Sequence, residues 1–116
     1  MKEAVIFSIE SDMCPVASAL RAIEGKWKLP ILWVLSQSGT LRYSELRKSI
    51  MGITNMMLTS SLKELEECGL VSRVQYNEIP PRVDYSLTKA GEKLLPVLDE
   101  LAKWGEELRG IQEAKP

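Results

Sequence analysis

The sequence predicts a mainly α-helical domain with one small β-hairpin, which is an α+β fold class. Between residues 15 and 67 the apolar side chains recur at helical spacing, in stretches that end near glycines. Between residues 71 and 87 the spacing changes to alternation on both sides of a Pro-Pro pair, as in a hairpin. The 116 residues suit one domain spanning 1–116, and 45% of them are hydrophobic, which is enough for a core without metal or disulfide staples.

The first two helices are predicted on either side of Gly25. The first spans about 14–24 and begins at Pro15, because proline suits the first position of a helix. The second ends at Gly39 and is nearly all apolar, so we expect it to be buried. Pro30 must lie in its first turn, since a deeper proline would break the helix.

A short helix, a tight turn and a longer amphipathic helix are predicted between residues 44 and 67. The short helix carries Leu46 and Ile50 on one face, and Thr54 stands where the N-cap of the longer helix belongs. Gly69 suits the C-terminal cap of that helix. The inward positions of the longer helix follow the i, i+4, i+7 rule and are Leu58, Leu62 and Leu65.

The hairpin and a last helix complete the predicted fold. Pro80 and Pro81 cannot continue a ladder, so the hairpin has an extended tip. Thr88 is expected to cap one long final helix over about 89–109. The apolar face of that helix is wider than a small domain needs for its own core, which favours a partner surface and hence a dimer. An alternative is that it covers only its own domain.

These elements, in this order, are the parts of a winged helix-turn-helix, whose second helix enters the major groove of DNA. The longer helix of the pair has no acid in its first two turns, and its acids come late, from Glu64 to Glu67. Amide, hydroxyl and thioether groups suit contacts with base edges. The side chains that we expect to face outward are Asn55, Met56, Thr59, Ser60 and Lys63.

Basic residues elsewhere in this core are candidates for phosphate contacts, which orient a protein on DNA. They are Arg42, Arg47 and Lys48 before the longer helix, which would be the recognition helix in the major groove, and Arg73 and Arg82 on the two sides of the hairpin tip. A merely solvated role is the alternative for each. The net charge of −1 argues weakly for DNA, but residues 25–89, the predicted DNA-binding core, carry +3 while both ends are acidic.

Composition argues against catalysis. The chain has no histidine, which removes the commonest general base and the commonest metal ligand. Its two cysteines lack the spacing of a zinc site, and no glycine-rich phosphate loop is present. We therefore predict no enzyme, no metal and no cofactor. With no signal peptide or membrane span in the sequence, we expect a cytoplasmic protein with reduced thiols, although one disulfide is an alternative.

The chain resembles the HxlR family of bacterial winged-helix regulators. The strings that carry the likeness are CPVASALRAIEGKWKLPILW, LRYSELRKSIMGIT, LTSSLKELEECGLVSR, PPRVDYSLTKAG and LAKW, in this order from Cys14 to Trp104. The resemblance implies a regulator of transcription, more often a repressor, that binds an inverted-repeat operator in double-stranded DNA as a homodimer. It adds Thr54 to the groove-facing set and implies that Arg82 lies on the wing.

The resemblance also implies that the dimer is built from the two terminal helices, 14–24 and 89–109. The residues that we expect there are Leu20, Leu94, Leu98, Leu101, Trp104 and Leu108. Where this chain has Met56, family members often carry a longer basic or polar side chain. The base preference of the family therefore does not carry over.

Regulation and function both have alternatives. Some HxlR-like proteins sense oxidants or electrophiles through a cysteine near the N-terminus, where this chain has Cys14. The positive end of a helix favours the reactive thiolate, although a structural role for Cys14 is the alternative. Cys68 is expected to be packed. The competing sensor is a pocket between the dimer helices for a small-molecule effector, lined by Trp27, Trp33 or Trp104. The other class of function is a winged-helix module that binds protein and not DNA.

Overall fold

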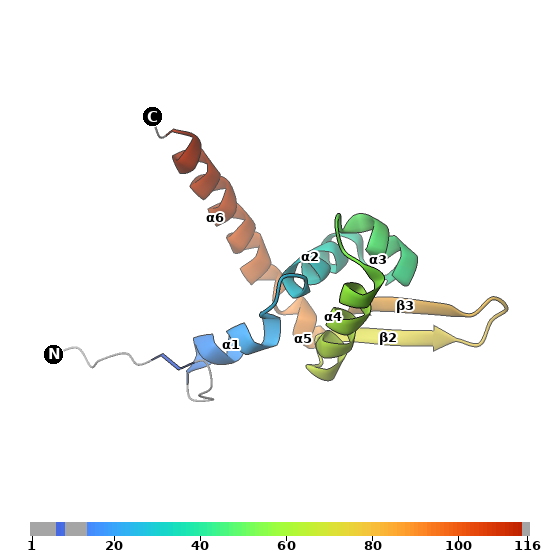
Figure 1. Ribbon diagram of the computed structural model, residues 1–116. Helices are drawn as coiled ribbons and strands as arrows, with labels where there is room; N and C mark the ends of the chain where they lie inside the picture. The colour runs from blue at the N-terminus through green and yellow to red at the C-terminus, as the bar shows by residue number, and fades with distance from the viewer. Residues whose placement is uncertain (1–6, 9–13, 115–116) are drawn as a thin grey trace.

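The computed structural model describes residues 7–8 and 14–114. Most of the first 13 residues, for which the sequence predicts no signal peptide, lie outside these described residues. The elements along the chain are α1 (Pro15–Ile23), α2 (Lys28–Ser38), β1 (Leu41–Arg42), α3 (Tyr43–Ser49), α4 (Asn55–Glu67), β2 (Val71–Tyr76), β3 (Arg82–Leu87), α5 (Lys89–Glu92) and α6 (Leu95–Glu113). The predicted α+β winged helix is confirmed (Figure 1).

The core lies where α2, α3 and α4 meet the small sheet. From α2, the inner face supplies Ile31, Leu32 and Leu35. The predicted inner face of α4 supplies Leu58, Leu62 and Leu65, each at most 1% exposed. Full burial of one such side chain stabilises the fold by about 1.5–3 kcal/mol. Helix α4 is therefore fixed to the body along its inner face.

Local signals set both ends of α4 as the sequence predicts. Thr54 is the N-cap, and its Oγ1 accepts a hydrogen bond from the Met57 amide at 3.1 Å. At the other end Gly69 adopts φ +78°, a left-handed conformation that favours glycine. The Leu70 amide then donates to the Leu65 carbonyl at 3.0 Å, which completes a Schellman motif.

The sheet has one strand more than the predicted hairpin. Its order is β1-β3-β2, and all pairs are antiparallel. Residues 40–43 are β-tolerant in sequence, and β1 pairs Leu41 with Tyr85 and Arg42 with Asp84. This short strand connects the start of α3 to the wing.

The single long helix expected over 89–109 is wrong in one respect, because the structure has two helices there. Thr88 caps only α5, through a bond from the Gly91 amide to its Oγ1 at 3.1 Å. A turn follows, and α6 starts at Leu95. Pro96 explains the break, since inside one continuous helix its ring would clash with the carbonyl of Glu92 four residues earlier.

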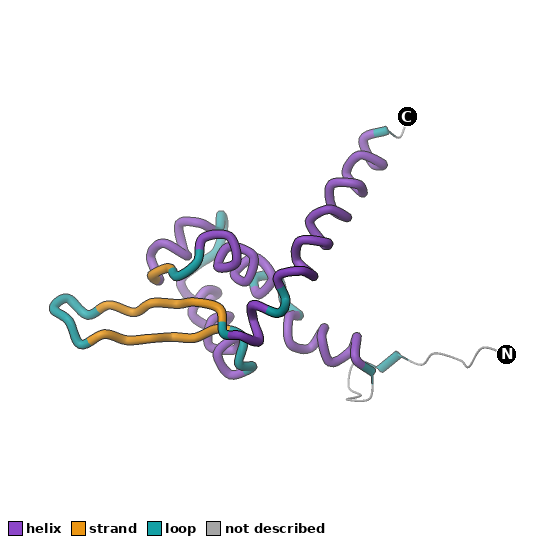
Figure 2. Tube along the Cα trace, turned by 180° about the vertical axis from the view of Figure 1, so that it is seen from behind, coloured by secondary structure: helices purple, strands orange, loops and turns teal. Residues whose placement is uncertain are grey.

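The two terminal helices point away from the wing. In Figures 1 and 2, α1 and α6 project from the body on the side opposite the β2–β3 hairpin. The long dimension of the molecule is 64 Å, and the short one is 24 Å. No helix in the described part of the chain has the length and the apolar character needed to cross a membrane.

Candidate nucleic-acid interface

The outer face of α4 is open to solvent. The groove-facing residues of the prediction, from Thr54 to Lys63, are all exposed, and Met56 is 81% exposed. The first turn of α4 holds no acid. This face therefore combines polar side chains with the exposed Met56 and is free of negative charge at its N-terminal end, which suits approach to DNA.

A residue that the sequence analysis missed joins α3 to this face. The Tyr43 hydroxyl lies 3.0 Å from the Asn55 carbonyl oxygen, 3.4 Å from Asn55 Oδ1 and 3.0 Å from Thr59 Oγ1. The Tyr43 ring packs against the core. Only tertiary contact places it beside Thr59, sixteen residues away, so no local pattern in the sequence could have revealed the link.

One acid in the C-terminal half of α4 is paired with a lysine of α2. Glu64 forms an ion pair with Lys28, with Lys28 Nζ and Glu64 Oε2 3.1 Å apart. Lys28 is buried and starts α2, so the pair ties that helix to α4. A lysine at the start of a nearly all-apolar helix was the available signal, and our sequence analysis did not use it.

The predicted phosphate-binding residues of α3 lie on the surface. Arg42 precedes the helix, where its amide donates to Glu45 Oε1 at 2.9 Å, and Arg47 and Lys48 lie in the last turn. Glu45 thus satisfies a free amide at the helix start. Among the described residues no ion pair engages Arg42, Arg47, Lys48 or Lys63.

The wing arginines are not brought together. In the hairpin register Arg73 is opposite Tyr85, and Arg82 is opposite Tyr76. Because side chains alternate along a strand, Arg73 and Arg82 extend from opposite faces of the hairpin. The β1 pairing puts Arg42 on the same face as Arg82.

Arg82 is held in a charged cluster. Its guanidinium stacks on Tyr76 at 4.1 Å from the ring centroid. Its Nη1 is 3.8 Å from Glu78 Oε1, and its Nε is 3.5 Å from Asp84 Oδ1. A hydrogen bond with Tyr76 and then the two carboxylates raise the pKa of Arg82, so the side chain remains a cation.

A hollow of about 370 Å³ lies between the start of α3 and the part of β3 next to the hairpin tip. Its lining residues are Arg42, Tyr43, Ser44, Pro81, Arg82 and Val83. It therefore has an arginine on each side and lies next to the tyrosine that contacts α4. The arginines of the hollow can donate to a phosphate of the DNA backbone, although Glu78 and Asp84 offset part of the positive charge.

The predicted dimerisation residues divide into two groups. Leu94 and Leu98 pack against the core of their own chain, and Leu20 on α1 is 40% exposed. The stripe beyond them on α6 runs at alternating spacings of four and three, the pattern of a coiled-coil seam. It consists of Val97, Leu101, Trp104, Leu108 and Ile111.

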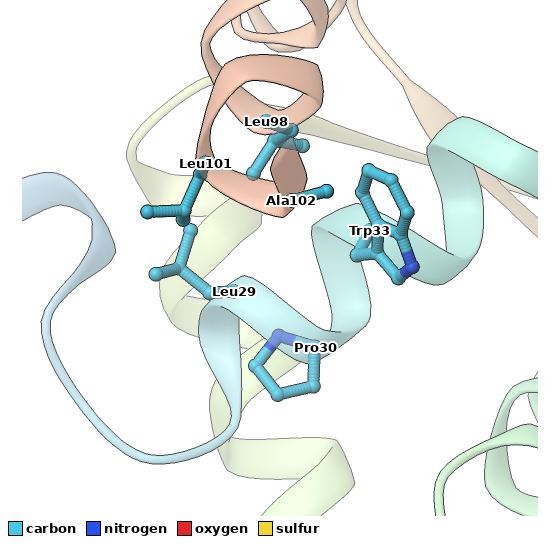
Figure 3. A pocket seen from close by; sticks show the side chains of 6 residues that line it. All are labelled: Leu29, Pro30, Trp33, Leu98, Leu101 and Ala102. Atoms are coloured by element: carbon cyan, nitrogen blue, oxygen red, sulfur yellow. The ribbon is translucent and has the colours of Figure 1, made fainter. Parts of the chain in front are cut away.

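An apolar groove adjoins this stripe. It measures about 400 Å³ and lies between α2 and α6 (Figure 3). Leu29, Pro30 and Trp33 line one side, and Leu98, Leu101 and Ala102 line the other. Of the three tryptophans expected around a pocket, only Trp33 lines this groove.

The two cysteines differ in position and in exposure. Cys14 is the N-cap residue of α1 and is partly exposed. Cys68 follows α4 and is exposed, so the expectation that it is packed is wrong. Both thiols are free, and no cluster of side chains suited to a metal ion occurs among the described residues.

The fold and this surface define a helix-turn-helix regulator of transcription of the winged type. The chain belongs to the HxlR-like helix-turn-helix family, whose model matches residues 22–113. An HTH-type transcriptional regulator of Methanothermobacter thermautotrophicus is 46% identical over 101 residues, which cover 87% of this chain and 76% of that protein. DNA binding and a role in regulation, rather than in catalysis, follow from this membership.

Solved structures of similar regulators have the same fold as this chain. The redox regulator HypR in its reduced form is 39% identical, with a TM-score of 0.81, and the match covers 88% of this chain and all of that one. The reduced form of the transcriptional regulator YodB from Bacillus subtilis is 35% identical, with a TM-score of 0.71 over 82% of this chain and 93% of that one. Both neighbours share the winged fold, and the first is a redox regulator by name.

Proposed function

We propose that this chain is a sequence-specific repressor that binds an inverted-repeat operator as a homodimer in the cytoplasm. The observation that carries the proposal is the outer face of α4, whose first turn holds no acid and which adjoins the hollow lined by Arg42 and Arg82. Base-reading side chains and a phosphate site thus lie side by side. Repression follows if the operator overlaps a promoter, since a bound dimer then blocks polymerase.

The apolar stripe of α6 supports the dimer. Val97 is 58% exposed, Trp104 57% and Ile111 62%, all on one helix that projects from the body. An apolar seam of this length on a free helix is costly in water and is stabilised by a second copy. A two-fold dimer would set its two α4 helices about 34 Å apart, one turn of DNA.

Selection from a random duplex library tests the operator. The purified protein is incubated with the library at about 50 mM and about 200 mM salt, because affinity that rests on phosphate contacts falls steeply over this range. We expect enrichment of an inverted repeat that is lost at the higher salt. No enrichment with either reduced or oxidised protein would reject DNA binding and leave a protein-binding module.

Repression is tested separately. The selected operator is placed between a promoter and a reporter gene, with a scrambled repeat as the matched control. Expression of the regulator should lower reporter output only with the intact repeat. Increased output would make the protein an activator.

We propose further that oxidation of Cys14 controls DNA binding. Cys14 is the N-cap residue of α1, and its free thiol is partly exposed, so an oxidant can reach it. The likeness to the redox regulator HypR supports this role. The Cys14→Ser protein should bind the operator normally and no longer respond to mild hypochlorite or quinone, whereas Cys68→Ser, the matched control, should respond like the parent. Equal responses of Cys14→Ser and parent would reject the sensor.

A further inference from the structure

The partners of the Tyr43 hydroxyl determine in which of its hydrogen bonds it donates and in which it accepts. A tyrosine hydroxyl has one proton to donate, and its oxygen can also accept. The Asn55 backbone oxygen, 3.0 Å away, can only accept, so the Tyr43 proton points toward it. The contact with Thr59 Oγ1, also 3.0 Å, then takes its proton from the threonine. Thr59 therefore donates inward and keeps only lone pairs for the outside.

We infer that Tyr43 is a positioning residue that turns Thr59 into a hydrogen-bond acceptor toward DNA. This inference rests on the proposed function, because it concerns how α4 reads bases. An acceptor in the major groove pairs with an exocyclic amino group, N6 of adenine or N4 of cytosine. It is repelled by the carbonyl oxygens of guanine and thymine. One position in each half-site should therefore favour A or C on the strand that Thr59 faces.

Without the tyrosine hydroxyl this preference should weaken. A threonine in a helix divides between two rotamers, because its Oγ1 can also bond the carbonyl of the turn before it. For Thr59 that turn includes Asn55, so loss of the Tyr43 bond frees the hydroxyl to rotate. A Tyr43→Phe protein keeps the ring that packs against the core. Its fold should thus survive while its base preference changes.

Duplex selection with three proteins tests the inference. The parent, Tyr43→Phe and Tyr85→Phe are compared, the last being a control that removes the hydroxyl of a buried tyrosine in β3. In the parent and the control, one position per half-site should favour A or C over G or T by roughly fivefold, a neutral hydrogen bond being worth about 1 kcal/mol. Tyr43→Phe should reduce this ratio to near one and leave the other positions unchanged. An unchanged preference at every position would overturn the inference.

A measurement on the free protein separates this inference from the proposed function. Three-bond couplings of the Thr59 γ-methyl carbon report its χ1 rotamer. The parent should show one rotamer, and Tyr43→Phe should show averaged couplings. A single unchanged rotamer in Tyr43→Phe would overturn the positioning role even if the protein binds DNA. If the parent enriches no duplex, DNA binding fails, and the couplings still decide whether Tyr43 orders Thr59.

Discussion

At the scale of single residues, the cations proposed to contact DNA differ in their surroundings. Lys63 is exposed on α4, and no described residue forms an ion pair with it. Arg82 is partly covered and lies near Glu78 and Asp84. Lys63 therefore has no carboxylate partner among the described residues, whereas Arg82 lies beside two carboxylates on the wing.

This difference predicts unequal effects of alanine. Lys63→Ala should reduce operator affinity and lower the salt slope by about one, the loss of one phosphate contact. Arg82→Ala should weaken binding further, because Glu78 and Asp84 would then face the DNA without their cation. Fluorescence anisotropy over a salt series measures both, with Lys103→Ala on α6 as the control. Parent-like affinity in both variants would contradict this placement of the DNA face.

At the scale of elements, residues at the helix ends determine where α4 and α5 begin and how they are joined. Thr54 caps the start of α4 by accepting one hydrogen bond from the Met57 amide. Thr88 caps the start of α5, and its hydroxyl also donates to the Gly69 carbonyl at 2.6 Å. The latter bond fastens α5 to the end of α4. Gly91 in α5 approaches the Leu70 backbone so closely that a side chain has no room.

The Thr54 cap predicts a measurable loss of stability. Thr54→Ala leaves the Met57 amide without its partner and should lower the free energy of unfolding by about 1 kcal/mol. Urea unfolding followed by circular dichroism measures it. Thr40→Ala, at an exposed loop position, should change the value by less than about 0.5 kcal/mol. Equal effects would show that the cap contributes nothing.

Two glycines predict opposite effects of the same substitution. At Gly91 an added Cβ would meet the Leu70 carbonyl oxygen, so Gly91→Ala should destabilise the protein by about 1–3 kcal/mol. Gly105 lies inside α6 with open space around it, and Gly105→Ala should stabilise by about 0.5–1 kcal/mol. The same unfolding assay compares them. A neutral Gly91→Ala would mean that α5 moves away from β2 at little cost.

At the scale of the whole molecule, the proposed DNA-binding surface and the proposed dimerisation helices lie at opposite ends of the fold. The wing and α4 lie on one side, and α1 and α6 project from the other (Figure 1). In the proposed dimer, affinity for a two-fold operator needs both ends of the fold, because each copy alone would contact only half of the site. Loss of the dimer should therefore cost DNA binding without altering the DNA face.

Trp104→Glu tests this separation. The substitution places a charge in the α6 stripe at a side chain that is 57% exposed, so the fold of one chain should persist. We expect a monomer in sedimentation experiments and a large loss of operator affinity, with unchanged circular dichroism. Lys103→Glu introduces the same side chain beside the stripe and should remain dimeric. A Trp104→Glu protein that still sediments as a dimer would move the interface elsewhere.

Local sequence patterns predict the helices from α1 to α4, the inner face of α4, its two caps and the approximate position of the wing. These follow from local rules, since helical spacing, capping residues and Pro-Pro pairs act over a few neighbours. Tertiary structure decided what depends on distant contacts. It paired β1 with β3, turned Leu94 and Leu98 into the core, put Arg73 and Arg82 on opposite faces and brought Tyr43 to Thr59. No local spacing encodes such contacts, because they arise only when elements separated along the chain pack together.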